Sequence, residues 1–134
     1  MQSFPFDDRP VVFEVTGKTI RTLLENGAAG RSPRFVQTSG LRYRVDMSQR
    51  SGRRIVGVEI GDDEGGWRAL NDSAPYRIVV NTYMARGRGE FAPLVGLEPM
   101  LTGDVREIDL ISDYLKRLGR LPVYGNDRIV VIRK

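Results

Sequence analysis

The sequence of 134 residues contains neither cysteine nor histidine. Without cysteine, the chain has no disulfide framework, no thiolate metal site and no redox chemistry on thiols. Without histidine, it can form neither a Ser-His-Asp arrangement nor a histidine-bearing two-metal site, because histidine is the usual proton shuttle near neutral pH and the commonest ligand of catalytic transition metals. Together, these absences exclude most hydrolase mechanisms from this chain.

Long apolar stretches and an export signal are missing as well. No segment approaches the length of a membrane-spanning run. The first residues lack a basic region followed by an apolar one. We therefore expect the chain as given to be soluble, with no membrane partner.

Lysine is scarce: with three lysines, 18 of the 21 basic residues are arginine, and the net charge is +4. Arginine makes planar bidentate contacts to phosphate, so one hypothesis is a basic module that binds nucleic acid. The other is a solvated surface, because the arginines are spread from Arg9 to Arg133 among 17 acidic residues. The even spread favours the solvated surface, and we do not expect nucleic acid as a partner.

The hydrophobic pattern predicts an α+β fold for one domain over residues 1–134, with a mixed β-sheet partly covered by two main helices. The first helix follows the cap Thr16 and ends at Asn26-Gly27, with an apolar stripe of Ile20, Leu23 and Leu24. The second covers residues 101–119. Strands are predicted at 11–15, 35–37, 41–46, 54–60, 67–70, 76–80 and 128–132.

Some side-chain orientations follow from the same pattern. In the strand at 54–60, alternation predicts one face formed by Val56, Val58 and Ile60, with Ile55 on the other. Glu25 is expected on the outward face of the first helix. The strand at 76–80 is continuously apolar, as in a central strand that is buried on both faces.

Several different short motifs follow one another along the chain. The first are Pro5-Phe6-Asp7-Asp8, Thr16-Gly17, Leu24-Glu25-Asn26-Gly27, Arg34-Phe35-Val36-Gln37-Thr38-Ser39-Gly40-Leu41-Arg42-Tyr43, Asp46, Gly52 and Arg53. They continue with the segment from Tyr76 to Gly89, the helix from Asp109 to Leu118, and Asp127-Arg128-Ile129. In order and spacing, the chain resembles the C-terminal domain of the 5'-nucleotidases over nearly all of its length.

The resemblance implies a function in nucleotide catabolism. In that family, a separate N-terminal metallophosphatase domain holds the catalytic two-metal centre, and the C-terminal domain recognises the nucleotide. This chain is therefore expected to be the substrate-recognition domain, inactive alone, without a cofactor, and partnered by a metallophosphatase domain. Family members are often exported, which gives the expected location of a full-length parent.

The resemblance also implies the residues that contact a base. Phe6 matches the family's first stacking aromatic and Tyr83 the second, which follows Asn81 at the end of a strand. Two rings presented by separate loops can hold a nucleobase between them. The alternatives are a Phe6 packed in the core with Phe4 or Phe13, and a Tyr83 in the core or at a strand edge with its hydroxyl satisfied by solvent.

The glycine-rich loop departs from the family pattern of Gly-Gly-Asp-Gly-aromatic. It reads Gly87-Arg88-Gly89-Glu90-Phe91, so the aspartate that is implied to bind the ribose hydroxyls is replaced by Gly89. Glu90 is a candidate substitute one residue later. Arg88, with Arg86, is either a phosphate ligand or a solvated loop residue. We expect substrate contacts from Gly87, Arg88, Gly89 and Glu90.

The altered loop keeps other functions open. The parent hydrolase could act on a substrate that is not a nucleotide, because loss of a charge-assisted contact redirects specificity. A structural interaction domain that has lost its ligand is a further alternative. Titration with adenosine distinguishes the three hypotheses when it is compared with Tyr83→Ala. Binding that ignores this substitution favours the non-nucleotide substrate, and no binding of any nucleoside by the folded chain favours the structural domain.

Overall fold

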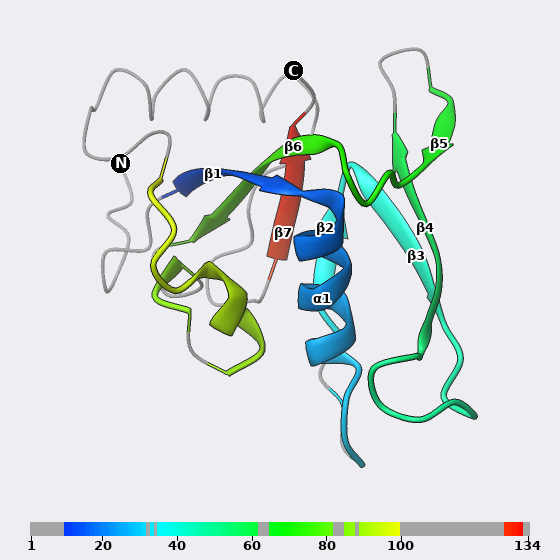
Figure 1. Cartoon of the computed structure of the whole chain (residues 1–134). Coiled ribbons are helices and arrows are strands. Elements are labelled where there is room, and N and C mark those ends of the chain that lie inside the picture. The colour runs from blue at the N-terminus through cyan, green and yellow to red at the C-terminus, as the bar shows by residue number, and fades with distance from the viewer. Residues whose placement is uncertain are drawn as a thin grey trace, which may run out of the picture.

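The computed structural model of the chain describes residues 10–31, 33, 35–61, 65–81, 85–87, 89–99 and 128–132. The strands of this part form two sheets, and one α-helix lies between them (Figure 1). The predicted α+β class is confirmed, with two sheets in place of a single one. The second predicted helix, over residues 101–119, lies outside the described residues.

The larger sheet has four strands in the order β1-β6-β7-β2. They are β1 (Pro10–Thr16), β6 (Pro75–Asn81), β7 (Arg128–Ile132) and β2 (Gln37–Ser39). The β1–β6 and β6–β7 pairs are antiparallel, and β2 runs parallel to β7. The sheet is therefore mixed, as predicted. Strand β6 lies inside it, and its consecutive residues Ile78, Val79 and Val80 are buried, which confirms the predicted central strand.

The smaller sheet is an antiparallel array of β3 (Leu41–Val45), β4 (Ile55–Gly61) and β5 (Trp67–Ala69). A single residue, Gly40, separates β2 from β3 and takes a φ of 78°. This left-handed conformation favours glycine and turns the chain from one sheet into the other. The Gly40 carbonyl accepts a hydrogen bond from the Gly61 N–H at 2.9 Å, which fixes the start of the smaller sheet.

A β-bulge in β4 overturns one predicted face. Arg44 lies opposite Gly57, but Val45 lies opposite Ile55, so Val56 is an extra residue without a direct partner. The extra residue shifts the alternation by one position. As a result, Ile55 is buried together with Val58 and Ile60, and Val56 is 52% exposed. The prediction that Val56 shares their face was wrong.

Helix α1 (Gly17–Gly27) begins where the sequence predicts. The Thr16 hydroxyl accepts a hydrogen bond from the Thr19 N–H at 3.3 Å, as an N-cap does. Gly17 is required by space, because a Cβ there would lie 2.1 Å from the Asn71 carbonyl oxygen. The helix ends at Gly27, and its predicted apolar stripe is buried in full: Ile20, Leu23 and Leu24.

Glu25 does not point into solvent, contrary to the prediction. Its carboxylate accepts hydrogen bonds from the N–H groups of Arg54 and Ile55, both at 3.0 Å. The Arg54 guanidinium in turn donates to the carbonyls of Ala28 and Gly30, at 2.7 and 2.8 Å. These bonds connect the end of α1 to the start of β4. They also supply partners for backbone N–H groups before β4 and backbone carbonyls after α1.

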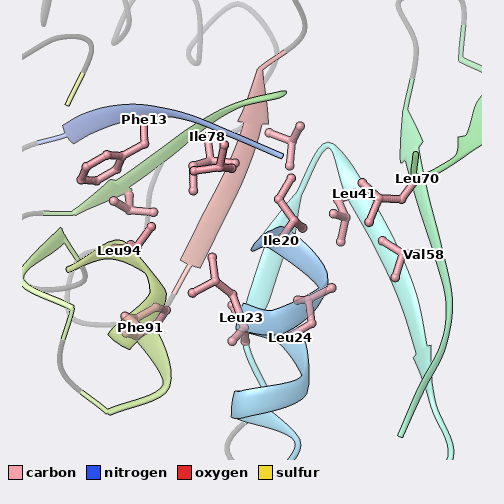
Figure 2. Close-up of a cluster of buried hydrophobic side chains, with 14 of the residues drawn as sticks. Phe13, Ile20, Leu23, Leu24, Leu41, Val58, Leu70, Ile78, Phe91 and Leu94 are labelled. Atoms are coloured by element: carbon pink, nitrogen blue, oxygen red, sulfur yellow. The ribbon is translucent and has the colours of Figure 1, made fainter. Parts of the chain in front are cut away.

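The two sheets, α1 and a short 3-10 helix share one core (Figure 2). The 3-10 helix η2 (Gly89–Leu94) packs on α1 and inserts Phe91 and Leu94. Phe13 and Ile78 enter from the larger sheet, and the smaller sheet contributes Leu41, Val58 and Ile60. The core therefore fixes η2, which follows β6 in the sequence, relative to the larger sheet.

The other face of the larger sheet is also covered. Val12 and Val79 lie opposite each other in β1 and β6 and are 2% and 3% exposed, yet neither belongs to the core cluster. Alternation along a strand places them on the opposite face.

Candidate functional site

The candidate site lies at one end of the larger sheet, where β1 begins and β6 ends. Pro10 is paired with Asn81 in the antiparallel register, so the chain enters β1 beside the point where it leaves β6. In the sequence, Phe6 precedes Pro10 by four residues and Tyr83 follows Asn81 by two. The two segments that carry these aromatic residues therefore join the sheet at the same end of neighbouring strands.

The remaining two strands begin at this same end. Val79 of β6 lies opposite Val130 of β7. Two residues after Val79, β6 ends at Asn81, and two residues before Val130, β7 begins at Arg128. Arg128 in turn is paired with Gln37, the first residue of β2. All four strands of the larger sheet (Figure 1) thus have an end here. Loops that leave a sheet at one end are the usual place for ligand-binding residues.

Phe35 is an aromatic residue that the sequence analysis did not select. It precedes Gln37 by two residues and is 49% exposed. Neighbouring strands lie about 4.8 Å apart, so the β6 and β2 ends, two strands apart, are separated by roughly 10 Å. A base between two rings needs them about 7 to 8 Å apart, at van der Waals contact on each face. Aromatic side chains near these two strand ends can therefore reach the ring separation that a base requires.

The predicted site residues are covered unevenly by the structure. Phe6, Tyr83 and Arg88 lie outside the described residues. Asn81 is the last residue of β6, in register with Pro10, and its side chain is outside the described part. The predicted ligand contacts of these four residues stay predictions. The sequence analysis placed Phe35 inside a strand at 35–37, whereas the strand begins at Gln37 and leaves Phe35 just before it.

The glycine-rich loop is anchored by packing. Gly87 is buried with a φ of 73°, and a Cβ there would lie 2.3 Å from Cγ2 of Val95 and 2.9 Å from its backbone nitrogen. Gly89 begins η2, and Phe91, the aromatic of the loop, is 1% exposed in the core. Gly87 and Phe91 thus hold the loop in place. A ligand contact by Gly87, Gly89 or Glu90 stays a prediction.

No polar or charged residue is buried as a whole in the part of the chain that the structure describes, although Nε of Arg77 is a buried atom. Arg86, between β6 and η2, is exposed. Burial raises the pKa of Tyr43, and hydrogen bonds from Ser48 lower the pKa of the Asp46 carboxyl. Both groups belong to the region of β3 in the smaller sheet and not to the candidate site.

The described part of the chain contains neither a metal-binding cluster nor a membrane-spanning helix. Within the described ranges, no three acidic side chains gather into a group that could hold a metal ion. The helices of the described part are too short or too polar to cross a lipid bilayer.

Known proteins match the sequence and the fold. The family model "5'-nucleotidase, C-terminal domain" matches residues 1–96. A probable 5'-nucleotidase of Treponema pallidum (strain Nichols) is 28% identical over 94% of this chain and 23% of its own length. The trifunctional nucleotide phosphoesterase protein YfkN of Bacillus subtilis (strain 168) is 28% identical over 86% of this chain and 8% of its own length.

A solved structure extends the match to three dimensions. The crystal structure of a 5'-nucleotidase precursor from Thermus thermophilus has a TM-score of 0.61 and 33% sequence identity, over 94% of this chain and 26% of that one. The match confirms the predicted fold. The chain spans about a quarter or less of the length of these relatives.

Proposed function

The chain belongs to the family of 5'-nucleotidase C-terminal domains, and we propose that it recognises the substrate of a 5'-nucleotidase-like hydrolase. The observation that carries the proposal is the pairing of Pro10 with Asn81. This register joins two aromatic-bearing segments, far apart in the sequence, to one end of one sheet. A ligand-binding site made of loops needs such a rigid base.

We propose that Tyr83 is one of the two rings that hold the base, forming a base clamp. Its partner ring comes from the segment before β1, with Phe6, or from the segment before β2, with Phe35. The exposure of Phe35 supports its part in binding, because a half-exposed phenylalanine beside a strand end contributes little to the core. Stacking of a base on each such ring is worth about 1 to 3 kcal/mol.

The loop after β6 is proposed to set the specificity for the sugar. Gly89 stands where the family has aspartate, so Glu90 or Asn81 would have to replace its hydrogen bonds to the ribose, and Arg88 would face a phosphate. If none of these residues does so, the parent hydrolase prefers a substrate that lacks ribose. This second candidate function is favoured by the altered loop alone.

Catalysis is assigned to the rest of the parent protein. We propose an N-terminal metallophosphatase domain with two metal ions as the partner, because this chain spans only 26% of its solved relative and contains no histidine. This domain alone is then inactive as a phosphohydrolase. The Thermus protein is described as a precursor, and export is proposed for the parent of this chain also.

Isothermal titration of the chain with adenosine tests the clamp. Tyr83→Ala should weaken binding about tenfold or more, since 1.4 kcal/mol corresponds to a factor of ten. Either Phe6→Ala or Phe35→Ala should have a similar effect and so identify the partner ring. Met47→Ala is the matched control, because Met47 is apolar, 42% exposed and on the β3–β4 turn.

Two results would count against the proposal. If all three aromatic variants bind adenosine as the unsubstituted chain does, the clamp does not exist. If adenosine does not bind while ribose-free phosphate esters bind and Tyr83→Ala weakens their binding, the nucleotide is the wrong substrate class.

A further inference from the structure

A second surface feature lies on the smaller sheet, away from the candidate site. The outer face of this sheet, which is turned away from the core, has a hollow of about 260 Å³ lined by Arg42, Tyr43, Arg44, Gly57 and Glu59. The residues come from β3 and β4, which appear at the right of Figure 1. Arg42 and Arg44 are two residues apart on one strand, so both extend from the same face.

Arg42 is held in place by its neighbours. Its Nε donates to the Glu59 carboxylate at 2.8 Å, and its guanidinium carbon lies 4.3 Å from the centre of the Trp67 ring. Trp67 rests on Gly61, where a Cβ would lie 3.4 Å from the ring. An arginine that is stacked and ion-paired at once is pre-ordered, and its remaining N–H groups stay available as donors.

Arg44 has no such partner within the described ranges. Its guanidinium lies over Gly57, where an added Cβ would be 3.0 Å from Nη2. Among the described residues, no acidic group pairs with Arg44, and its side chain is exposed. Because Glu59 already compensates Arg42, the three charges of the hollow sum to +1. Because Gly57 has no side chain, its backbone forms the floor of the hollow.

We propose that this hollow binds a phosphate group, either free phosphate or the phosphate of a small monoester. Two guanidinium groups that begin about 6.6 Å apart along one strand can direct N–H groups at the oxygens of one tetrahedral anion. The unpaired charge of Arg44 supplies the attraction, and Arg42 supplies a fixed donor. Glu59 can accept a hydrogen bond from a hydroxyl of the bound group. The site is separate from the proposed nucleoside clamp, which is on the other sheet.

Trp67 reports on this hollow directly, because it is the only tryptophan of the chain. Titration with inorganic phosphate should change its fluorescence in a saturable way, while potassium chloride at equal ionic strength should not. A parallel titration with ribose 5-phosphate distinguishes the two sources of phosphate. Tighter binding of the ester assigns the site to a monoester, and equal or weaker binding assigns it to free phosphate.

Variants locate the anion. Arg44→Gln should weaken phosphate binding at least about tenfold, because a charge-assisted hydrogen bond is lost. Gly57→Ala should weaken it severalfold, because the methyl group fills the floor and displaces Nη2 of Arg44. Arg50→Gln is the matched control: Arg50 is an exposed arginine on the β3–β4 turn, and its loss changes the net charge equally.

The proposal fails if chloride reproduces the fluorescence change, or if Arg44→Gln or Gly57→Ala binds phosphate as tightly as the unsubstituted chain. Circular dichroism confirms that each variant is folded. Tyr83→Ala should leave phosphate binding to this hollow unchanged, so failure of the base clamp and failure of this site are distinguishable.

Discussion

The carboxylate of Glu25, near the end of α1, accepts the backbone N–H of Ile55, at the start of β4, at 3.0 Å. Its other oxygen accepts the N–H of Arg54 at the same distance. Since 29 and 30 residues separate the partners, these bonds connect elements that are distant in the sequence. One side chain thereby accepts the N–H groups of the first residue of β4 and of the residue before it, and joins the helix to the smaller sheet.

Replacement of Glu25 by alanine should destabilise the domain. Two part-buried backbone N–H groups lose their acceptor, which costs about 1 to 3 kcal/mol for each group left unsatisfied. Urea unfolding followed by circular dichroism measures the change in the free energy of unfolding. Glu98→Ala is the control, because Glu98 is exposed and should change this free energy by less than about 0.5 kcal/mol. Equal midpoints for the two variants would contradict the structural role of Glu25.

Gly17→Ala should be more damaging than its position in a helix suggests. Alanine favours helices by up to about 1 kcal/mol over glycine, but the added Cβ would lie 2.1 Å from the Asn71 carbonyl oxygen, a backbone atom. Overpacking of this kind costs about 1 to 3 kcal/mol. Gly52→Ala isolates the conformational effect, since Gly52 has a φ of 95° and nothing within 4 Å of its Cβ position.

The two glycine variants are compared by thermal unfolding. We expect Gly17→Ala to have the lower Tm, because only that substitution displaces backbone. A Gly17→Ala variant as stable as the unsubstituted chain would show that the approach of Asn71 to the helix is not required.

Phe91→Ala should affect stability before it affects any ligand. Phe91 is 1% exposed, and removal of a buried phenyl ring costs about 3 to 5 kcal/mol. Leu97→Ala is the control, because Leu97 is apolar, belongs to the same segment and is 40% exposed. Urea unfolding should separate the two variants clearly. If Phe91→Ala lost adenosine affinity at unchanged stability, the ring would belong to the binding site instead of the core.

Ser48→Ala should raise the pKa of Asp46. The Ser48 hydroxyl and N–H both donate to Asp46 Oδ1, and these bonds hold the pKa of Asp46 below its ordinary value. A carboxyl with a lowered folded-state pKa contributes stability above its unfolded pKa, and this contribution is lost as the pH falls through the folded value. Alanine removes the hydroxyl bond and keeps the N–H bond, so the pKa of Asp46 should rise but stay below the ordinary value.

An NMR titration of the Asp46 side-chain carboxyl between acidic and neutral pH measures this pKa in both proteins. No difference between them would show that the Ser48 hydroxyl does not contribute to the lowered pKa of Asp46.

Local patterns predicted the elements well. The cap Thr16, the buried stripe of α1 and the central strand β6 depend on neighbours in the sequence, so periodicity was sufficient to find them. The bulge at Val56 and the inward position of Glu25 depend on partners in other elements. Alternation or helical spacing cannot reveal such partners, and both orientations were predicted wrongly. The division into two sheets at Gly40 has the same cause.

The candidate site was predicted from motif resemblance. The strand register adds the spatial proximity of its two segments, which the sequence does not show. Neither Phe6 nor Tyr83 is placed by the structure, but the strands to which their segments connect are paired at Pro10 and Asn81. Phe35 was passed over because its motif reads as the start of a strand. Only the parallel pairing of β2 with β7 brings Phe35 to the same end of the sheet.

The order β1-β6-β7-β2 has a consequence for biosynthesis. The strand formed by residues 128–132 is inserted between one from the middle of the chain and one from its first third, so among the described strands β2 has no neighbour in its sheet until residues 128–132 leave the ribosome. Until residues 128–132 have been translated, β2 and one edge of the apolar strand β6 therefore have no described strand to pair with. Protection of these segments by a chaperone during synthesis would suit such a topology.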